Sequence, residues 1–341
     1  MRVLVTGGCG LIGFHTAKHY RELGYEVDVM DNLERSDLLG HEVSDERKNF
    51  NKNLLQDLGV HVYQYDVSKE ESWGIFSGHD VIVHLAAQCG VPTSIANPRR
   101  DYEVNLFGTF NALEYARRHD SKFVFASTNK VYPIHDMFVH KEKRWHFTNP
   151  SWAVHGFPVN NDLTGSRTPY GWSKYSADLL CQEYYHTYGI RTGVFRMSCI
   201  YGPNQFGFEE QGWATWLVIA TEKGLPITIY GDGDQVRDML YVEDVVRAYD
   251  SFVQSDVEHG VYNLGGGVEN TLSLNECIYL LEKLTGKKSS ISYEGWRPSD
   301  QKSYVSNISD AVMDLGWYPR VNPLDGLKKV HEWVRENVGV F

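Results

Sequence analysis

The chain has 341 residues, of which 42% are hydrophobic and 23% charged, so it suits one large domain or two packed ones and excludes wholesale disorder. Lysine and arginine total 33 against 44 for aspartate and glutamate, and the formal net charge of -11 argues against a nucleic-acid-binding protein. No apolar stretch approaches the roughly 20 residues of a membrane helix, and no secretory signal is visible. The five cysteines are dispersed without CxxC spacing, which indicates reduced thiols in a cytoplasmic protein, without a disulfide or a metal site.

Short β-branched runs alternate with helix-like segments through the first half of the chain. The predicted strands are 2–6, 26–30, 61–65, 81–84 and 123–126, and the clearest predicted helices are 12–23 and 104–119. Strand–helix–strand alternation predicts an α/β fold with a Rossmann-type, doubly wound parallel sheet. Such a sheet binds its ligands at the carboxyl ends of the strands.

The pattern changes further along the chain. Residues 36–52 are polar and are expected to form a surface excursion, and residues 133–169, with four prolines and many aromatic residues, are expected to form a long ordered loop or lid. Beyond about residue 195 the elements become mixed and shorter. We expect a first domain over residues 1–190, completed by parts of 232–265, and a smaller mixed α/β domain mainly over 191–341.

A glycine-rich turn follows the first predicted strand and opens the first helix. The run 6–13 (TGGCGLIG) fits GxGxxG through Gly8, Gly10 and Gly13, and it fits GxxGxxG when Gly7 replaces Gly8. Glycine lets the backbone turn sharply and approach a pyrophosphate, which the free N–H groups of the helix N-terminus then bind. A tight turn without a ligand would also use glycines, but the strand–turn–helix context favours a dinucleotide.

Acidic residues end the second and third predicted strands. Asp31 lies about 20 residues after the glycines, as a ribose-binding acid should, and its carboxylate would repel a 2′-phosphate. NAD is therefore favoured over NADP, although Arg35 lies close enough to leave NADP open. Asp66 could accept a hydrogen bond from the adenine amine, or it could simply cap a helix.

Tyr170 and Lys174 form a YxxxK pattern that places both side chains on one helix face. A nearby ammonium group can lower the pKa of the phenol from about 10, so that a phenolate can take a proton from a sugar hydroxyl. Two other YxxxK matches, at 65–69 and 279–283, fall on a strand end and on an amphipathic helix. Only Tyr170 begins a helix after a strand that ends in a polar run, so context selects this pair.

Several further segments have polar or glycine residues at strand ends and turns. They are HLAAQ at 84–88, VNLFGT at 104–109, Thr128 after the strand FVFA, Phe195-Arg196 before Tyr201-Gly202, and the run 235–238 (QVRD) with Asp244. With the glycine loop and the YxxxK pair, they resemble the extended short-chain dehydrogenase/reductase superfamily over essentially the whole chain. The resemblance implies a catalytic triad of Thr128, Tyr170 and Lys174, and a nucleoside diphosphate sugar bound by residues 190–300.

The resemblance also assigns binding residues. Those expected at NAD are Gly7, Gly10, Leu11, Ile12, Gly13, Asp31, Asn32, Arg35, Asp66, Val67, Leu85, Ala86, Ala87, Gln88, Asn105, Tyr170, Lys174 and Met197. Those expected at the sugar nucleotide are Gln88, Thr128, Asn129, Cys199, Gln211, Arg237, Arg297 and Asp300, where a guanidinium fork suits diphosphate oxygens. The superfamily also implies a homodimer formed through helices 104–119 and 170–188.

The residues after Thr128 help to distinguish which reaction of the superfamily the chain catalyses. Sugar 4,6-dehydratases carry an acid pair there, whereas this chain has Asn129 and Lys130, so an epimerase is favoured. The run 127–132 (STNKVY), with QGW at 211–213 and SDQ at 299–301, looks like the CDP-tyvelose 2-epimerase family. That resemblance implies inversion at C2 of a CDP-hexose; a UDP-hexose 4-epimerase and a non-catalytic binding protein stay open.

Three residues depart from that family's pattern, and four histidines cluster in the lid region. Pro133, Met197 and Cys199 replace residues usual in relatives, so substrate identity does not transfer directly. His135, His140, His146 and His155 are irregularly spaced among lysines and arginines, and no metal is expected there.

Overall fold

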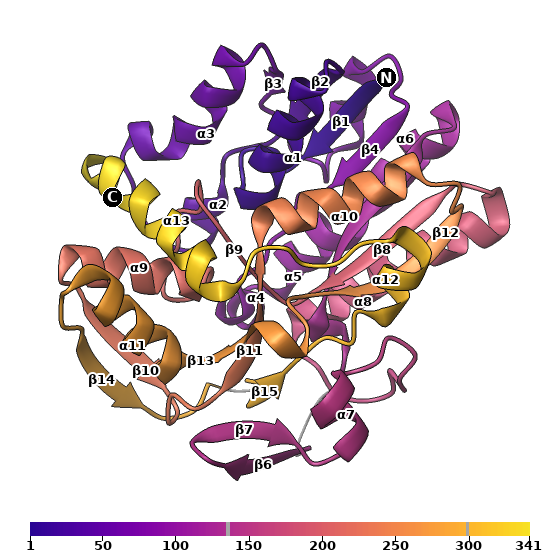
Figure 1. Ribbon diagram of the computed structural model, residues 1–341. Coiled ribbons are helices and arrows are strands. Elements are labelled where there is room, and N and C mark those ends of the chain that lie inside the picture. Colours follow the sequence, from indigo (N-terminus) through magenta and orange to yellow (C-terminus); the bar gives the residue numbers. More distant parts are fainter. Residues whose placement is uncertain (134–136, 298–299) are drawn as a thin grey trace. The chain divides into compact units, whose positions relative to one another are not determined.

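A seven-stranded sheet forms the centre of the first of two units into which the chain divides (Figure 1). The computed structural model describes residues 1–133, 137–297 and 300–341, and the first unit consists of Met1–Val131, Ser166–Arg196 and Val246–Tyr262. The order of strands across the sheet is β12 (His259–Leu264), β8 (Thr192–Met197), β5 (Lys122–Thr128), β4 (Val81–His84), β1 (Arg2–Thr6), β2 (Glu26–Met30) and β3 (His61–Tyr63). The pairings of β1 with β2 and β4, of β2 with β3 and of β4 with β5 are parallel. This is the order of a doubly wound sheet, as predicted.

Helices bury both faces of this sheet. Leu4 of β1 and Ile82 of β4 belong to one buried cluster with residues of α6 and α8, whereas Val3, Val5 and Val83 alternate to the opposite face. Both sets are buried, which explains why these strands are continuous apolar runs.

The helices of the unit are α1 (Leu11–Glu22), α2 (Arg35–Leu38), α3 (Asp45–Asp57), η1 (Glu70–Ile75), α4 (Val91–Ala96), α5 (Pro98–Asp101), η2 (Tyr102–Phe107), α6 (Gly108–His119), η3 (Asn129–Val131), α8 (Pro169–Tyr188) and α10 (Val242–Gln254). None of the helices in the described part of the chain has both the length and the apolarity to span a bilayer.

Most predicted elements of the first unit are confirmed, with shifted ends. Strand β3 ends two residues earlier than expected, and β5 extends to include Thr128. The helix expected over 104–119 begins as the π-helical turn η2 and continues as α6. The stretch 36–52, expected as a surface excursion, has mostly exposed or half-buried residues and contributes to helices α2 and α3, which were not predicted. Helix α3 buries few apolar residues, and its N-terminus is stabilised by the Ser44 side chain, which accepts the Arg47 N–H.

The second unit consists of Tyr132–Gly165, Met197–Val245 and Asn263–Phe341. Strand β11 (Val236–Tyr241) is its central strand and pairs with β9 (Cys199–Tyr201), β13 (Thr271–Ser273) and β15 (Ser303–Tyr304). The other strands form two pairs, β10 (Pro226–Tyr230) with β14 (Ser290–Glu294) and β6 (Phe138–Lys141) with β7 (Arg144–Phe147). The helices are α7 (Pro150–His155), α9 (Trp213–Lys223), η4 (Val268–Asn270), α11 (Leu274–Thr285), α12 (Ser309–Leu315), α13 (Pro323–Glu336) and η5 (Val338–Val340). The unit therefore has the mixed α/β character that was expected.

The stretch expected to be a long loop contains regular structure. Strands β6 and β7 form an antiparallel hairpin, and α7 follows with the Asn149 side chain as its cap. The positive φ angles of Glu142 and Lys143 form the turn between the strands, without the glycine or asparagine that usually marks it. The stretch is therefore not one long loop, because a hairpin and a short helix lie within residues 138–155.

Candidate active site

The glycine loop fits closely against the neighbouring strands. Gly7 has a φ of +67° and donates its N–H to the Met30 carbonyl at 2.8 Å, and a Cβ there would lie 2.7 Å from the Ala86 nitrogen. A Cβ on Gly13 would lie 2.2 Å from the Gly7 oxygen. Gly10 differs, because its Cβ would meet only the Gly7 oxygen, at 3.3 Å. Packing within the chain therefore requires Gly7 and Gly13, whereas the approach of a ligand would best explain Gly10.

Helix α1 begins directly after this loop without a side-chain cap. Gly10 occupies the N-cap position and has no side chain, so the first N–H groups of the helix, which include those of Leu11 and Ile12, have no side-chain cap. These N–H groups and the positive end of the helix dipole suit an anionic phosphate.

Asp31 follows β2 and faces the glycine loop. Its Oδ2 accepts the Cys9 N–H at 2.9 Å, and its Oδ1 accepts the Leu33 N–H at 2.8 Å. Burial raises the pKa of Asp31, and these two N–H groups counteract that effect. A carboxylate has about four acceptor positions, so Asp31 retains capacity for the two hydroxyls of a ribose.

Arg35 lies at the start of α2. Burial raises the pKa of the Cys89 thiol in the loop after β4, and the charge of Arg35 partly counteracts this effect, so the two residues lie close together. Burial and the nearby charge of Arg35 lower the pKa of Arg47, from helix α3, to about 10. Arg47 was not predicted as a site residue, because it lies in the helix that was not predicted.

Asp66 lies in a turn after β3. Its Oδ1 accepts the N–H and the hydroxyl of Ser68, at 2.8 and 2.7 Å, and its Oδ2 accepts Arg100 Nη2 at 2.9 Å. The same Arg100 nitrogen donates to Glu34 Oε2 at 3.0 Å, which also accepts the amide of Asn32 at 2.9 Å. Asp66 is not the N-cap of the next helix, because that position belongs to Lys69.

The segment after β4 is fixed by two buried side chains. Thr6 Oγ1 accepts the N–H groups of Leu85 and Ala86, each at 3.2 Å, and contacts His84 Nδ1 at 2.8 Å. Burial, with a contribution from the charge of Lys174, lowers the pKa of His84 to about 3, so this histidine is neutral. The HLAAQ run therefore begins with a structural histidine and then presents the backbone of 85–87 beside the glycine loop.

Gln88 and Asn105 are buried, and their side-chain amides bond to protein partners. Gln88 Nε2 donates to the Gly90 carbonyl and to Asp101 Oδ2, at 3.0 and 2.8 Å. Asn105 Nδ2 donates to the Gln88 carbonyl and to Ser173 Oγ, at 3.0 and 2.9 Å. These two predicted binding residues thus tie the loop after β4 to helix α8. Their contact with a ligand stays a prediction.

The three predicted catalytic residues come together in the first unit. Thr128 ends β5, Tyr170 and Lys174 lie one turn apart at the start of α8, and the Thr128 hydroxyl is hydrogen-bonded to the Tyr170 phenol. Thr128 and Lys174 are 8% and 2% exposed. Asn129, next to Thr128, is also buried.

In the protein alone, burial outweighs the groups that lower the pKa of Tyr170. Burial raises the pKa of Tyr170, with smaller contributions from Cys89 and Asp101, and only the bond from Thr128 lowers it. Burial also lowers the pKa of Lys174 to about 8, and its Nζ lies 4.1 Å from the centre of the Phe125 ring. Lowering the pKa of the phenol therefore requires a further positive charge.

A buried ion pair anchors α8 to the sheet. Arg196 Nε and Nη2 donate to the two Asp178 oxygens at 2.9 and 3.0 Å, and Ser127 Oγ donates to Asp178 Oδ2 at 2.6 Å. The carboxylate also accepts the amide of Gln182 at 2.7 Å. This fork holds the helix that carries Tyr170 against the strand that carries Thr128.

In the second unit, three residues predicted to bind the sugar nucleotide lie close together, namely Arg237, Arg297 and Asp300, and each arginine contacts a carboxylate. Arg237 Nη2 donates to Asp300 Oδ1 at 2.9 Å, and the Asp300 N–H donates to the Arg297 carbonyl at 3.2 Å. Arg297 lies 3.9 Å over the Tyr230 ring and contacts the Glu209 carboxylate at 3.4 Å.

Two other residues of this unit predicted to bind the sugar nucleotide, Gln211 and Cys199, belong to segments that adjoin Glu209 or pair with β11. Gln211 pairs with Phe208 in the segment that contains Glu209, and Cys199 lies opposite Met239 two residues along β11 from Arg237. Met197, predicted at the cofactor, is the first residue of its segment of the second unit. Glu209 and Tyr230 were not predicted.

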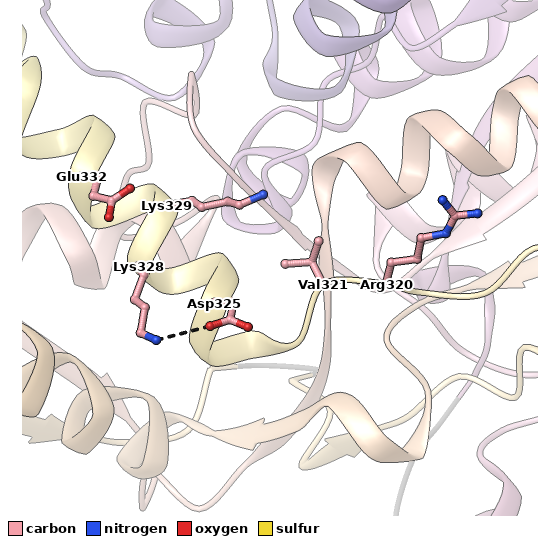
Figure 2. Close-up of a pocket in the computed structure, with 6 residues that line it drawn as sticks. All are labelled: Arg320, Val321, Asp325, Lys328, Lys329 and Glu332. Carbon is pink, nitrogen blue, oxygen red and sulfur yellow. Dashed lines mark hydrogen bonds and ion pairs between the residues drawn. The ribbon is translucent and has the colours of Figure 1, made fainter.

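Two other polar features of this unit do not belong to the predicted site. His140 contacts Asp234 at 2.8 Å, and Asp232, which accepts the Trp145 N–H, lies beside them. His140 and Asp232 are exposed, and exposed acidic groups commonly cluster without an ion. His135 lies outside the described residues. Figure 2 shows a surface hollow whose lining includes none of the predicted residues; Lys328 bonds to Asp325 there at 3.3 Å, and Arg320, Val321, Lys329 and Glu332 complete it.

Comparison with known proteins assigns the family. Residues 3–265 match the family described as the NAD dependent epimerase/dehydratase family. The chain is 32% identical to a CDP-paratose 2-epimerase of Salmonella typhi, over 98% of this chain and 99% of the relative. It also resembles the UDP-glucose 4-epimerase of Thermotoga maritima solved with UDP-glucose, with a TM-score of 0.82, 30% identity and coverage of 99% and 100% of the two chains.

A UDP-glucuronic acid 4-epimerase of Bacillus cereus was solved with UDP-glucuronic acid and NAD, and it has a TM-score of 0.81 and 26% identity over 98% of this chain and 99% of its own. The glycine loop and Asp31 provide the features that NAD requires. The chain is therefore an enzyme of the NAD dependent epimerase/dehydratase family, within the extended short-chain dehydrogenases/reductases.

Proposed function

We propose that this enzyme inverts C2 of a nucleoside diphosphate hexose, with a CDP-linked sugar as the favoured substrate, through a transient 2-keto sugar. The observation that carries the proposal is the contact of Thr128 with Tyr170, one helical turn from a buried Lys174. These residues form an acid–base group at the carboxyl ends of the strands, where a doubly wound sheet binds its ligands.

The chemistry is a reversible oxidation. When bound, NAD supplies the hydride acceptor and a positive charge that favours the phenolate. Tyr170 takes the proton of the C2 hydroxyl as the C–H bond breaks, which leaves a ketone at C2. The same hydride returns to the other face of the ketone, and Tyr170 returns the proton, so no net oxidation results.

Lys174 and Thr128 support the base. With a pKa of about 8, Lys174 is mostly protonated at neutral pH, and its charge favours the phenolate. The Thr128 hydroxyl already lowers the pKa of Tyr170 by hydrogen bonding to it. We propose that Thr128 and Asn129 also hold the sugar.

The residues beside the triad support epimerisation over dehydration. A dehydratase of this family needs a carboxylic acid pair after the catalytic threonine, to protonate the leaving hydroxyl. Asn129 and Lys130 follow Thr128 in η3, and neither can act as a carboxylic acid. Without such an acid, elimination of water from the ketone is disfavoured, and its reduction completes an epimerisation.

Two observations favour C2 and a CDP-sugar. The STNKVY, QGW and SDQ runs resemble the CDP-tyvelose 2-epimerases, and the full-length relative at 32% identity is a CDP-paratose 2-epimerase. We also propose that the first unit holds NAD, and that Arg237 and Arg297 of the second unit bind the diphosphate after exchanging Asp300 and Glu209 for phosphate oxygens.

The test is to incubate the purified enzyme with CDP-paratose or CDP-glucose in deuterated water and to follow the sugar by NMR. We expect inversion at C2, no accumulation of NADH and no deuterium at C2, because the hydride returns within one active site. Inversion at C4 alone would contradict the proposal.

A UDP-hexose 4-epimerase is the second candidate, and the UDP-glucose 4-epimerase neighbour at 30% identity favours it. A parallel incubation with UDP-glucose distinguishes the two, because this candidate predicts UDP-galactose as product. If neither sugar nucleotide changes, a protein that binds NAD without catalysis becomes the better explanation.

We propose further that the enzyme is a homodimer formed through α6 and α8. Apolar side chains are exposed on these helices and on the adjoining η2, namely Phe107, Phe110, Trp172 and Leu179, which are 57%, 43%, 42% and 44% exposed. Helices α6 and α8 also contact each other, so their outer faces are neighbours. Large exposed apolar side chains on neighbouring helices suit an interface between copies.

A further inference from the structure

Arg100 makes an unusual pair of contacts at the carboxyl ends of β2 and β3. One guanidinium nitrogen, Nη2, donates to Asp66 Oδ2 at 2.9 Å and to Glu34 Oε2 at 3.0 Å. The Arg100 side chain is only 18% exposed, whereas that of Arg99, its neighbour on α5, is 86% exposed. Arg100 therefore points into the unit and joins two loops that are far apart in the sequence.

The two loops contain the residues predicted to bind the adenosine half of NAD. The first contains Asp31 and Asn32, and Asn32 donates to the same Glu34 oxygen that Arg100 holds. The second contains Asp66, predicted to accept the adenine amine. Because Glu34 and Asp66 bond to one nitrogen, their carboxylates lie close together, and their charges would repel each other without the guanidinium.

The bonding of Asp66 leaves one acceptor position free. A carboxylate offers about four positions. Ser68 takes two on Oδ1 and Arg100 takes one on Oδ2, so one remains on Oδ2. That position matches the single N–H that an adenine amine would direct at the carboxylate.

We propose that Arg100 is a positioning residue for the adenosine half of NAD. It holds the loops after β2 and β3 together, keeps Asp66 charged and directs the free position of Oδ2 at the adenine amine. The hydrogen bond from Arg100 is the main influence that lowers the pKa of Asp66 against the effect of burial. The proposal rests on NAD binding and not on which sugar carbon is inverted.

The test compares NAD with its deamino analogue, in which hypoxanthine replaces adenine and the amine is absent. The purified full-length protein, freed of bound nucleotide, is titrated with each compound by calorimetry. We expect the wild type to bind NAD at least about tenfold more tightly than deamino-NAD, because the carboxylate then faces a carbonyl oxygen. In Arg100→Met, NAD should bind about tenfold or more weakly than in the wild type, and the preference should fall to about threefold or less.

Arg99→Met is the matched control, because Arg99 lies on the same short helix, is 86% exposed and pairs with Glu103 on the surface. It should leave both affinities unchanged. Asp66→Asn should also reduce the preference for NAD over deamino-NAD. That result would support the proposal even if Arg100→Met folds poorly. Equal weakening of NAD and deamino-NAD in Arg100→Met would show a merely structural role and overturn the inference. A wild type that binds neither compound would instead overturn the assignment of NAD itself.

Discussion

The Tyr170 hydroxyl has a pKa that burial raises in the protein alone. Burial raises its pKa and only the Thr128 hydroxyl lowers it, whereas Lys174 stays charged beside the Phe125 ring. The phenol therefore stays protonated in the absence of a further charge. This arrangement couples proton removal to the binding of the oxidised cofactor, because NAD+ brings positive charge to the site.

The substitution Tyr170→Phe tests this role directly. It removes the hydroxyl and keeps the ring, so the packing at the start of α8 should persist. We expect turnover of the sugar nucleotide to fall by about 10²–10⁴-fold, the range for loss of a general acid–base group. The affinity for NAD, measured by calorimetry, should change little.

Tyr279→Phe is the matched control for that experiment. Tyr279 belongs to another YxxxK pattern, and it is 56% exposed on α11 with Lys283 stacked 4.4 Å over its ring. Turnover should be unchanged. If Tyr170→Phe retained full activity, the proton would have to leave through another group.

At this scale the sequence could place Tyr170 beside Lys174, because their spacing of four residues makes them neighbours on any helix. It could not reveal Asp101 or Arg100. Both lie on the four-residue helix α5, where tertiary packing alone decides which side chain points inward. Asp101 contacts Gln88 and Arg100 contacts Asp66, and no local pattern encodes either contact.

At the scale of the elements, a buried lysine of strand β5 caps the C-terminal end of helix α10. Lys122, at the start of β5, donates from Nζ to the carbonyls of Phe252, Val253 and Ser255 at 2.6, 3.3 and 2.8 Å. The last carbonyls of a helix have no partner within it, and the negative end of the helix dipole favours a cation there. Burial lowers the pKa of Lys122, so these three bonds offset the loss of its hydration.

The substitution Lys122→Met should therefore destabilise the first unit. It leaves three carbonyls without this donor, which should cost about 2–4 kcal/mol and lower the midpoint of thermal unfolding by about 5–10 °C. Circular dichroism measures the midpoint. Lys18→Met is the control, because Lys18 is 43% exposed and lies 3.8 Å from Glu22, and it should change the midpoint by no more than about 1–2 °C. Equal midpoints for the two variants would contradict the capping role.

The elements that the sequence predicts well are those whose local pattern agrees with their burial. Strands β1 and β4 are buried on both faces and are largely continuous apolar runs, and β2 has β-branched or apolar residues at every second position, so the predicted bounds of all three are confirmed. Helix α3 was missed because Leu55 is its only buried apolar residue. Its start could have been found from Ser44 followed by Asp45 and Glu46, since a capping serine and acids in the first turn favour a helix N-terminus.

For the molecule as a whole, the remaining question is how many copies assemble. The exposed apolar residues Phe107 and Phe110 lie on η2 and α6, and Trp172 and Leu179 lie on α8. Nothing in the pattern of a single chain separates an interface from a core face, because both need apolar residues at helical spacing. The exposure of these side chains in the folded chain makes the distinction.

We expect the wild type to elute as a dimer in size-exclusion chromatography with light scattering, and Phe107→Glu with Leu179→Glu to elute as a monomer. Two carboxylates on each copy would be buried without partners in the interface, which costs several kcal/mol. Met313→Glu is the control, because Met313 is 72% exposed on α12 and has no part in the proposed interface. That variant should stay dimeric. A monomeric wild type, or a dimer that survives both glutamates, would contradict an interface on α6 and α8 and leave their exposed aromatic residues without this explanation.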